Sequence, residues 1–285
     1  MKLVTFRRSS NGAPEAGLLE GSEVYPLQPL GYADAESFIA AGPAALAAAR
    51  SLIGQRGGTP LSGVELLAPV LHPPRIFCVG LNYLDHAAES KMAVQAVPTI
   101  FMKLASAITG PGSDIVLPAN SMQPDYEAEL AVVIGRHAAN VTRGNWRECV
   151  FGYTILNDVS ARDVQLATSQ WTLGKSFPTF CPIGPWIVTA DELTDPHRLD
   201  VRLTIDGEIM QQANTRDFIF DIPAVLGYIS AVVPLEPGDI VSTGTPQGVG
   251  LGRTPQRWLH PGEEVAIDIG GIGRLVNSTV TARPA

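Results

Sequence analysis

The sequence predicts a mainly β fold of the α+β class, with a small N-terminal α+β module ahead of a larger, strand-rich domain. Glycine (28) and proline (23) make up a larger share of the 285 residues than the ~12% usual in proteins, so turns must be numerous. Strand-like apolar runs are short and are separated by turn signals such as Asp206-Gly207 and Pro261-Gly262. Many short strands with few helices are typical of a barrel or a rolled sandwich.

The small module is expected to span residues 1–70. Three strand-like pieces come first, and an alanine-rich helical stretch and a loop follow them. The expected strands are 2–6, 16–19 and 23–26, the helical stretch is 33–52, and the loop is 54–60. Because the module has no histidine and no clustered carboxylates on an apolar strand, we predict a structural or oligomerising role for it.

The larger domain is expected to span residues 71–285. A helix or lid segment is predicted at 82–92, and a second helix at 222–232, before Pro234. The expected strands, each a short apolar or β-branched run, are 76–79, 99–103, 126–134, 150–157, 186–189, 200–205, 239–243, 264–269 and 275–281.

Charge and composition exclude several classes of protein. The formal net charge is −8 and basic residues do not cluster beyond Arg7-Arg8, which excludes nucleic acid as the main partner, since phosphate binding needs a basic footprint. No apolar run approaches the roughly 20 residues that cross a bilayer, and the first residues lack the apolar stretch of a signal peptide, so we expect no membrane association. The three cysteines, Cys78, Cys149 and Cys181, are odd in number and widely spaced. This predicts buried free thiols and fits a reducing cytoplasm.

The run 126–134 places two carboxylates in a strand-like apolar segment. Side chains alternate along a strand, so Glu127 and Glu129 point to the same face, roughly 7 Å apart. Both faces of the run are otherwise apolar, and adjacent buried carboxylates are costly unless a cation neutralises them. Oxygen ligands favour Mg²⁺, Mn²⁺ or Ca²⁺ over zinc. The alternative is an edge strand whose two glutamates are solvated.

A third carboxylate, Asp158, follows the apolar run 150–157. The end of a buried strand is a natural place for a ligand, so Asp158 is predicted to complete a metal site with Glu127 and Glu129. An ordinary Asn157-Asp158 turn is the alternative.

Three further residues are candidates for the chemistry. Lys175 lies between small and aromatic residues, where its ammonium could oppose an anionic substrate or a developing oxyanion, although a surface lysine is the alternative. His86 and Glu89 are adjacent on a helix face, and a carboxylate beside an imidazole can orient it for activating water. Such a pair is more often a surface hydrogen bond.

The glycine-rich loop 244–250 lacks the ending of a phosphate loop and indicates a backbone that approaches a small ligand closely.

Taken in order, these motifs resemble the catalytic domain of the fumarylacetoacetate hydrolase (FAH) family. The resemblance covers residues 71–285, and the first 70 residues resemble the variable N-terminal extension of many members. The segments that carry it are 76–83, 85–89, 101–103, 125–130, 157–163, 174–177 and 238–246. One position departs from the pattern, because Pro178 stands where many members have an aspartate. The departure concerns the shape of this loop and leaves Lys175 in place.

The resemblance implies an FAH-type mixed β-sandwich roll, a homodimer, and one Mg²⁺ or Mn²⁺ ion on Glu127, Glu129 and Asp158. It implies that His86 and Glu89 form a dyad on a mobile lid that closes over a small keto-acid substrate. The residues expected to contact that substrate are Lys175, Gln165, Lys103, Tyr83 and Thr245, of which Thr245 would bind the substrate carboxylate.

The activity that we predict from the resemblance is hydrolytic cleavage of a C–C bond in a 2,4-dioxo acid, such as an acylpyruvate or fumarylpyruvate, to pyruvate and a carboxylic acid. His86, oriented by Glu89, would activate the water that attacks the C4 carbonyl. The metal and Lys175 would stabilise the departing enolate. The same site could serve an oxaloacetate decarboxylase, a 2-hydroxy-dienoate isomerase or a sugar-acid dehydratase, and a non-catalytic keto-acid sensor is a further alternative. The presence of the dyad favours hydrolysis.

Overall fold

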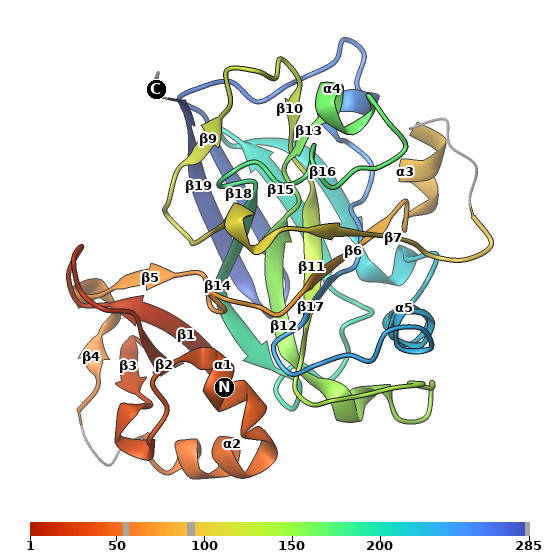
Figure 1. The fold of residues 1–285 in the computed structure, drawn as a ribbon. Coiled ribbons are helices and arrows are strands. Elements are labelled where there is room, and N and C mark those ends of the chain that lie inside the picture. Colours follow the sequence, from red (N-terminus) through yellow and green to blue (C-terminus); the bar gives the residue numbers. More distant parts are fainter. Residues whose placement is uncertain (54–56, 90–94, 283–285) are drawn as a thin grey trace.

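The computed structural model describes residues 1–53, 57–89 and 95–282. Within these ranges most strands belong to one large mixed sheet of 12 strands (Figure 1). Its hydrogen-bonded order is β4 (Thr59–Pro60), β3 (Glu23–Pro26), β2 (Glu15–Glu20), β1 (Lys2–Arg7), β14 (Cys181–Thr189), β12 (Val150–Asn157), β11 (Ala128–Ile134), β17 (Ile240–Ser242), β6 (Ile76–Gly80) and β7 (Thr99–Lys103), with β5 (Glu65–Leu67) on β1 and β8 (Ile108–Thr109) on β14. The predicted mainly β fold is confirmed.

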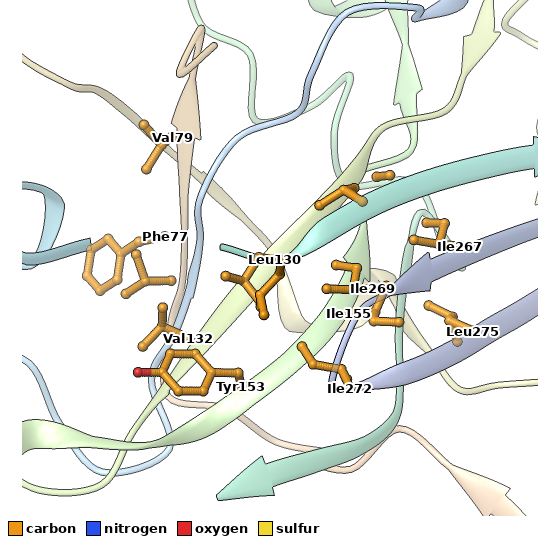
Figure 2. Packing of buried hydrophobic residues seen from close by; sticks show 14 of the residues in the cluster. Phe77, Val79, Leu130, Val132, Tyr153, Ile155, Ile267, Ile269, Ile272 and Leu275 are labelled. Atoms are coloured by element: carbon orange, nitrogen blue, oxygen red, sulfur yellow. The ribbon is translucent and has the colours of Figure 1, made fainter. Parts of the chain in front are cut away.

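A second sheet packs against the first and closes the roll. Its five strands, in order, are β16 (Glu208–Asn214), β15 (Asp200–Ile205), β18 (Glu264–Ile269), β19 (Gly273–Thr281) and β9 (Ile115–Leu117). A short ladder joins β10 (Pro124–Asp125) to β13 (Ser160–Ala161). Figure 2 shows the core between the sheets, where Leu130 and Ile155 of the large sheet face Ile267 and Ile269 of the small one. This face-to-face packing is that of a β-sandwich.

The first 70 residues continue the large sheet. Strand β1 pairs antiparallel with β14, with Leu3 opposite Ile187, and one hydrophobic cluster joins residues of both parts, including Leu18, Phe38, Phe151 and Ile183. The N-terminal residues thus share a sheet and a core with the larger domain. Their oligomerising role stays a prediction.

The helical stretch predicted at 33–52 is two short helices, α1 (Ala35–Ala40) and α2 (Gly42–Arg50). Gly42 has a φ of 71°, a left-handed conformation that favours glycine. Pro43 follows in the first turn of α2, where its missing N–H costs nothing. The predicted helical stretch is therefore divided into two helices at Ala41.

Several predicted boundaries also differ from the structure. Part of the predicted loop 54–60 forms β4, and residues 54–56 lie outside the described residues. The helix predicted at 82–92 is α3 (Leu84–Glu89), and residues 90–92 lie outside the described residues. Strand β14 starts before the predicted 186, and β16 was not predicted, because its glutamines interrupt the apolar alternation.

Strand β11 carries the predicted carboxylates to the centre of the large sheet. It lies between β12 and β17, and all seven of its residues are buried. Leu130 and Val132 pack into the core between the sheets, whereas Ala131 and Val133 pack into the cluster on the opposite face. The alternative of a solvated edge strand is therefore wrong. Among the described helices, none is long and apolar enough to cross a membrane.

Helix α5 (Ile222–Ser230) begins beside a half-buried imidazole. The Nε2 atom of His197 accepts a hydrogen bond from the Ile222 N–H at 3.2 Å, and its ring lies edge-on to Trp146 with centroids 5.8 Å apart. Burial lowers the pKa of His197 from its ordinary 6.5, although the carboxylates of Asp221 and Asp195 oppose this shift. The neutral imidazole is therefore the form that the fold favours.

This lowered pKa predicts a loss of stability in mild acid. Below about pH 6.5 the unfolded chain binds a proton that the folded chain does not, so the free energy of unfolding falls between about pH 7 and about pH 5. In His197→Asn, whose amide oxygen can still accept the Ile222 bond, this part of the loss should vanish. Urea unfolding of both proteins at the two pH values measures it, and equal losses would refute the assignment.

Candidate active site

Three buried carboxylates meet at one point of the fold. Glu127, immediately before β11, Glu129 within β11 and Asp158 after β12 each offer an oxygen within 4.8 Å of the others. Their exposed fractions are 4%, 2% and 0%. The predicted cluster of ligand residues is thus assembled by two neighbouring antiparallel strands, and the Asp158 N–H donates to the Glu127 carbonyl at 2.9 Å.

Two of the carboxylates are balanced by cations of the chain. Arg162 Nη2 donates to Glu127 Oε1 at 2.5 Å, and Lys175 Nζ donates to Glu127 Oε2 at 2.7 Å and to Asp158 Oδ2 at 2.8 Å. Burial opposes ionisation of Glu127, but the charges of Arg162 and Lys175 outweigh it and hold its pKa well below its usual range. Lys103 Nζ donates to Asp158 Oδ1 at 2.7 Å. Glu127 and Asp158 therefore each have direct cationic partners.

Glu129 has a different environment. Its Oε2 accepts from the Ser242 hydroxyl at 2.6 Å and from the Gly244 N–H at 2.8 Å, and both donors are neutral. Burial, together with the negative charges of Asp158 and Glu127, raises the pKa of Glu129 well above its usual range. The cluster thus contains one carboxylate whose charge lacks a direct cationic partner among the described residues.

This imbalance fits a divalent cation. An ion held by Glu127, Glu129 and Asp158 would bring positive charge to the carboxylate that lacks it, and carboxylate oxygens are the ligands that Mg²⁺ and Mn²⁺ prefer. A surface cluster of acids would be solvated instead, whereas these three are removed from water. The residues present therefore fit the metal that the sequence predicted.

The predicted dyad lies on α3. His86 Nδ1 is 3.4 Å from Glu89 Oε2, and both Glu89 oxygens also accept from the Gly248 N–H at 3.1 Å. Gly252 lies so close that a β-carbon there would overlap the Glu89 carboxylate. Because Nδ1 faces Glu89, Nε2 is the ring nitrogen available to a ligand. His86 itself is only 6% exposed and lines the pocket described next.

A pocket of about 150 Å³ opens over the carboxylates. Its lining residues are Val79, Gly80, Leu81, His86, Phe101, Glu127, Glu129, Arg162, Gln165, Leu166, Trp171, Lys175, Thr245 and Leu251. The pocket is smaller than the roughly 300–1,000 Å³ of sites for drug-sized ligands. It therefore suits a compact anionic substrate held among acidic and basic side chains.

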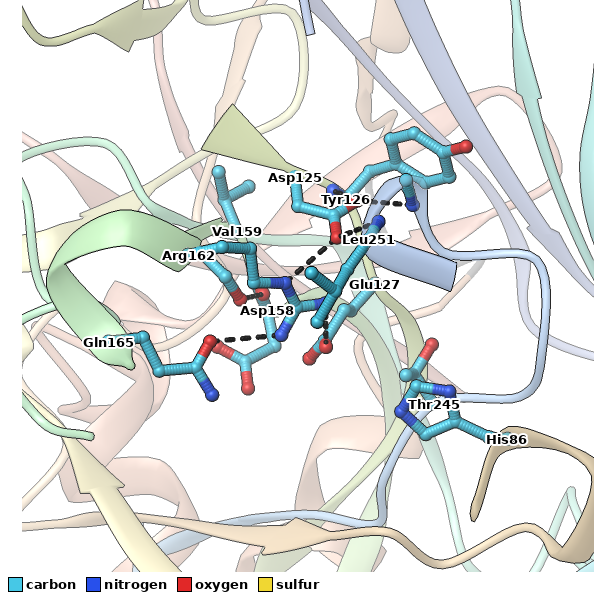
Figure 3. A network of polar contacts seen from close by, with 12 residues as sticks. His86, Asp125, Tyr126, Glu127, Asp158, Val159, Arg162, Gln165, Thr245 and Leu251 are labelled. Carbon is cyan, nitrogen blue, oxygen red and sulfur yellow. Dashed lines mark hydrogen bonds and ion pairs between the residues drawn. The ribbon is translucent and has the colours of Figure 1, made fainter. Parts of the chain in front are cut away.

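Two charged residues that sequence reasoning did not assign organise this pocket. Arg162, at the start of α4 (Arg162–Gln165), donates from Nε to Asp125 Oδ2 at 2.8 Å and from Nη1 to Gln165 Oε1 at 2.9 Å, as Figure 3 shows. Asp125 also accepts from the Gly250 and Leu251 N–H groups at 2.6 and 3.0 Å. Asp125 thereby ties the loop beside Glu89 to the arginine. An arginine following three small or apolar residues was the signal in the sequence.

Gln165, Lys175 and Thr245, three of the predicted substrate contacts, line the pocket, and the other two do not. Lys103 is 1% exposed and lies behind Asp158, where it also donates to the Lys175 carbonyl. Tyr83 is 2% exposed and packs against Phe218 with ring centroids 5.0 Å apart. In this structure Lys103 and Tyr83 support the site and do not reach the pocket, because tertiary packing covers both of them.

The turn that carries Lys175 lies directly against α4. Ala161 donates its N–H to the Gly174 carbonyl at 2.8 Å, and a β-carbon on Gly174 would overlap the backbone of Gln165. Glycine is thus required where these two segments meet. Pro178, the departure from the family pattern, lies after this turn and is exposed, so it leaves Lys175 in contact with the carboxylates.

A rolled β-sandwich with three buried carboxylates is the fold and site of a known family of proteins, which the comparison of this sequence with family models identifies. Residues 75–281 match the family model described as "Fumarylacetoacetate (FAA) hydrolase C-terminal". The chain therefore belongs to the fumarylacetoacetate hydrolase family, as its motifs indicated, and this is a family of enzymes.

Individual relatives cover nearly the whole chain. Over 288 aligned residues it is 40% identical to "Oxaloacetate tautomerase FAHD2A, mitochondrial" of Bos taurus and to the human protein of the same name, covering 98% of this chain and 92% of each relative. The maleylpyruvate hydrolase of Sphingobium sp. SYK-6, solved with manganese (II) ion and pyruvate, has a TM-score of 0.85 at 33% identity, covering 99% of this chain and all of that one. A 5-carboxymethyl-2-hydroxymuconate delta-isomerase from Mycobacterium smegmatis has a TM-score of 0.78 at 34% identity, with both chains fully covered.

Proposed function

We propose that this protein is a divalent-metal-dependent enzyme that interconverts the enol and keto forms of a short 2-oxo acid of the oxaloacetate class. The observation that carries the proposal is a small pocket lined by two carboxylates of the buried cluster, by the cations Arg162 and Lys175, and by the His86 imidazole. The full-length similarity to oxaloacetate tautomerases supports the reaction class. The volume of about 150 Å³ supports a substrate as small as a four-carbon diacid.

A Mg²⁺ or Mn²⁺ ion on Glu127, Glu129 and Asp158 would supply a Lewis acid that favours negative charge on the 2-oxo oxygen of the substrate. Lys175 and Arg162 also line the pocket. They would attract the substrate carboxylates and favour the enolate over the neutral enol. Gln165 and Thr245 remain proposed contacts of the substrate.

His86 would carry the proton. In ketonisation the enol oxygen gives up its proton and C3 gains one, so the reaction is balanced without a second reactant. His86 Nε2 is the atom proposed to exchange the proton with C3, while Glu89, fixed by Gly248, orients the ring. Leu166 and Leu251 add apolar side chains to the lining of the pocket in which this transfer would take place.

The hydrolysis of a 2,4-dioxo acid is the second candidate. The His86–Glu89 pair favours it, because the same imidazole could remove a proton from a water molecule, and a maleylpyruvate hydrolase is among the similar structures. In that case the C–C bond would break to give pyruvate and a carboxylic acid. Decarboxylation, isomerisation and dehydration are further reactions of the same enolate.

The two candidates are separated by the substrates on which the enzyme acts. The enol of oxaloacetate should lose its ultraviolet absorbance faster with protein and Mg²⁺ or Mn²⁺, and at the uncatalysed rate with EDTA. Acetylpyruvate and fumarylpyruvate should release no pyruvate. Pyruvate release from these two diketo acids without acceleration of ketonisation would contradict the proposal and favour hydrolysis, and activity that survives EDTA would remove the metal from both.

The remaining expectations about the molecule are proposals as well. We propose a homodimer that acts on a small keto acid without nucleic acid or membrane partners. The three cysteines are free and buried, which supports a reducing compartment such as the cytoplasm. The similar tautomerases carry the word "mitochondrial" in their names.

A further inference from the structure

An indole closes the pocket at the end of strand β6. Trp171 lines the pocket, and a β-carbon added to Gly80 would stand 2.7 Å from Trp171 Cζ3. Real β-carbons do not approach a ring carbon so closely, so the absence of a side chain at residue 80 provides the space in which the indole lies. Thr99, the partner of Gly80 on β7, would be in ordinary contact at 3.5 Å.

A second aromatic ring extends this surface. Phe101 of β7 also lines the pocket, and its ring lies edge-on to Trp171 with centroids 5.3 Å apart. The Lys175 ammonium lies 5.1 Å from the Phe101 centroid and 2.7 Å from Glu127 Oε2. One ammonium group therefore reaches both the aromatic surface and the carboxylates. We call Trp171 and Phe101 the aromatic wall.

Strand order places the wall at a distance from the carboxylates along the sheet. Glu129 lies on β11, followed in order by β17, β6 and β7, and neighbouring strands are ~4.8 Å apart. Gly80 and Phe101 are thus on the second and third strands from the ligand strand. Glu127, Phe101 and Trp171 nevertheless line one pocket, so the C3 substituent of a 2-oxo acid held at the carboxylates would extend toward the aromatic wall.

We infer that Trp171 determines substrate specificity by limiting the size of the C3 substituent, an inference that rests on the proposed function. The wall is apolar, fixed on one side by β6 and on the other by Phe101, and it closes a pocket of only about 150 Å³. A closely packed wall of this kind discriminates sharply, because even one methylene group is worth about 10- to 200-fold in specificity. Trp171 contacts the substituent and takes no part in proton transfer.

The test compares two 2-oxo acids that differ only at C3, pyruvate and the bulkier phenylpyruvate. Binding of each to Mn²⁺-loaded protein is measured by isothermal titration calorimetry, so the readout does not depend on turnover. In Trp171→Ala the affinity for phenylpyruvate relative to pyruvate should rise by at least about tenfold. Leu173→Ala is the matched control, because Leu173 lies in the same segment but is 74% exposed, and its ratio should equal that of the wild type.

A second variant distinguishes contact with the indole from general damage. In Gly80→Ala the new methyl group displaces the Trp171 ring, so both acids should bind more weakly than to the wild type. In the double variant Gly80→Ala/Trp171→Ala the displaced ring is absent, and binding should return to that of Trp171→Ala alone. Additive losses in the double variant would overturn the inference, because they would show that Gly80 does not act through Trp171.

The outcomes separate this inference from the function on which it rests. Failure of pyruvate to bind the metal-loaded wild type would overturn the proposed function together with the inference. Normal pyruvate binding with an unchanged affinity ratio in Trp171→Ala would overturn the inference alone. A raised ratio with restored binding in the double variant supports it.

Discussion

Glu129→Gln is expected to weaken the binding of Mn²⁺ by more than about 100-fold. Replacing a residue that only supports a metal ligand costs up to about 100-fold in affinity, and the loss of a ligand charge should cost more. Glutamine keeps the shape of the side chain, and its amide oxygen can accept the hydrogen bonds from Ser242 and Gly244. The change therefore removes a ligand charge while the strand pairing stays intact. Calorimetric titration with Mn²⁺ measures the loss.

Compared with the wild type, the same variant should be more stable in EDTA and less stable with excess Mn²⁺. In EDTA it should be more stable than the wild type, because one carboxylate has been removed from a buried group of three. With excess Mn²⁺ only the wild type should gain stability, by about 2.7 kcal/mol at a free ion concentration 100 times its dissociation constant. Glu208→Gln, at an exposed position, is the control and should behave as the wild type. Equal Mn²⁺ affinity in Glu129→Gln would remove Glu129 from the ligand set.

His86→Ala should lower kcat/KM for the proposed reaction by about 10²- to 10⁴-fold, the range expected when a general acid–base is lost. The affinity for Mn²⁺ should change little, because the imidazole makes its hydrogen bond to Glu89 and not to a carboxylate of the cluster. The rate of ketonisation of enol-oxaloacetate and a Mn²⁺ titration of the same sample measure the two effects.

Glu89→Gln and His72→Ala complete this comparison. Glu89→Gln keeps an acceptor for the Gly248 N–H but removes the charge beside the ring, so its activity should fall between those of the wild type and His86→Ala. His72 is exposed, and its replacement should leave the rate unchanged. A His86→Ala protein with wild-type activity would show that the proton moves through another group.

The meeting of the three buried carboxylates was predictable from the sequence because it depends on local rules. Alternation along a strand places Glu127 and Glu129 on one face, and the end of the next strand supplies Asp158. The antiparallel pairing of β11 with β12, with Ala128 opposite Asn157, brings the two ends together. The His86–Glu89 contact was likewise predictable, since both residues are on one helix face.

The rest of the site depends on contacts between distant segments. Lys103 ends an edge strand, where a lysine is usually solvated, but the turn at Lys175 covers it and its ammonium becomes a partner of Asp158. Arg162 and Asp125 meet only because β13 pairs with β10. Trp171 stands in a polar segment with no periodicity, so its place in the pocket wall over Gly80 is seen only in the folded chain. Such contacts are set by tertiary packing and leave little trace in local sequence.

A 2-oxo acid is expected to bind to a divalent ion held by Glu127, Glu129 and Asp158. Electron paramagnetic resonance of the Mn²⁺-loaded protein can detect this contact. The ligand is oxalate, a stable analogue of the enolate, labelled with an oxygen isotope that has a nuclear spin. We expect one bound Mn²⁺ per chain, whose signals broaden with the labelled oxalate and not with unlabelled oxalate. Unchanged signals in the presence of bound oxalate, or Mn²⁺ binding that persists when Glu129 is replaced by glutamine, would contradict it.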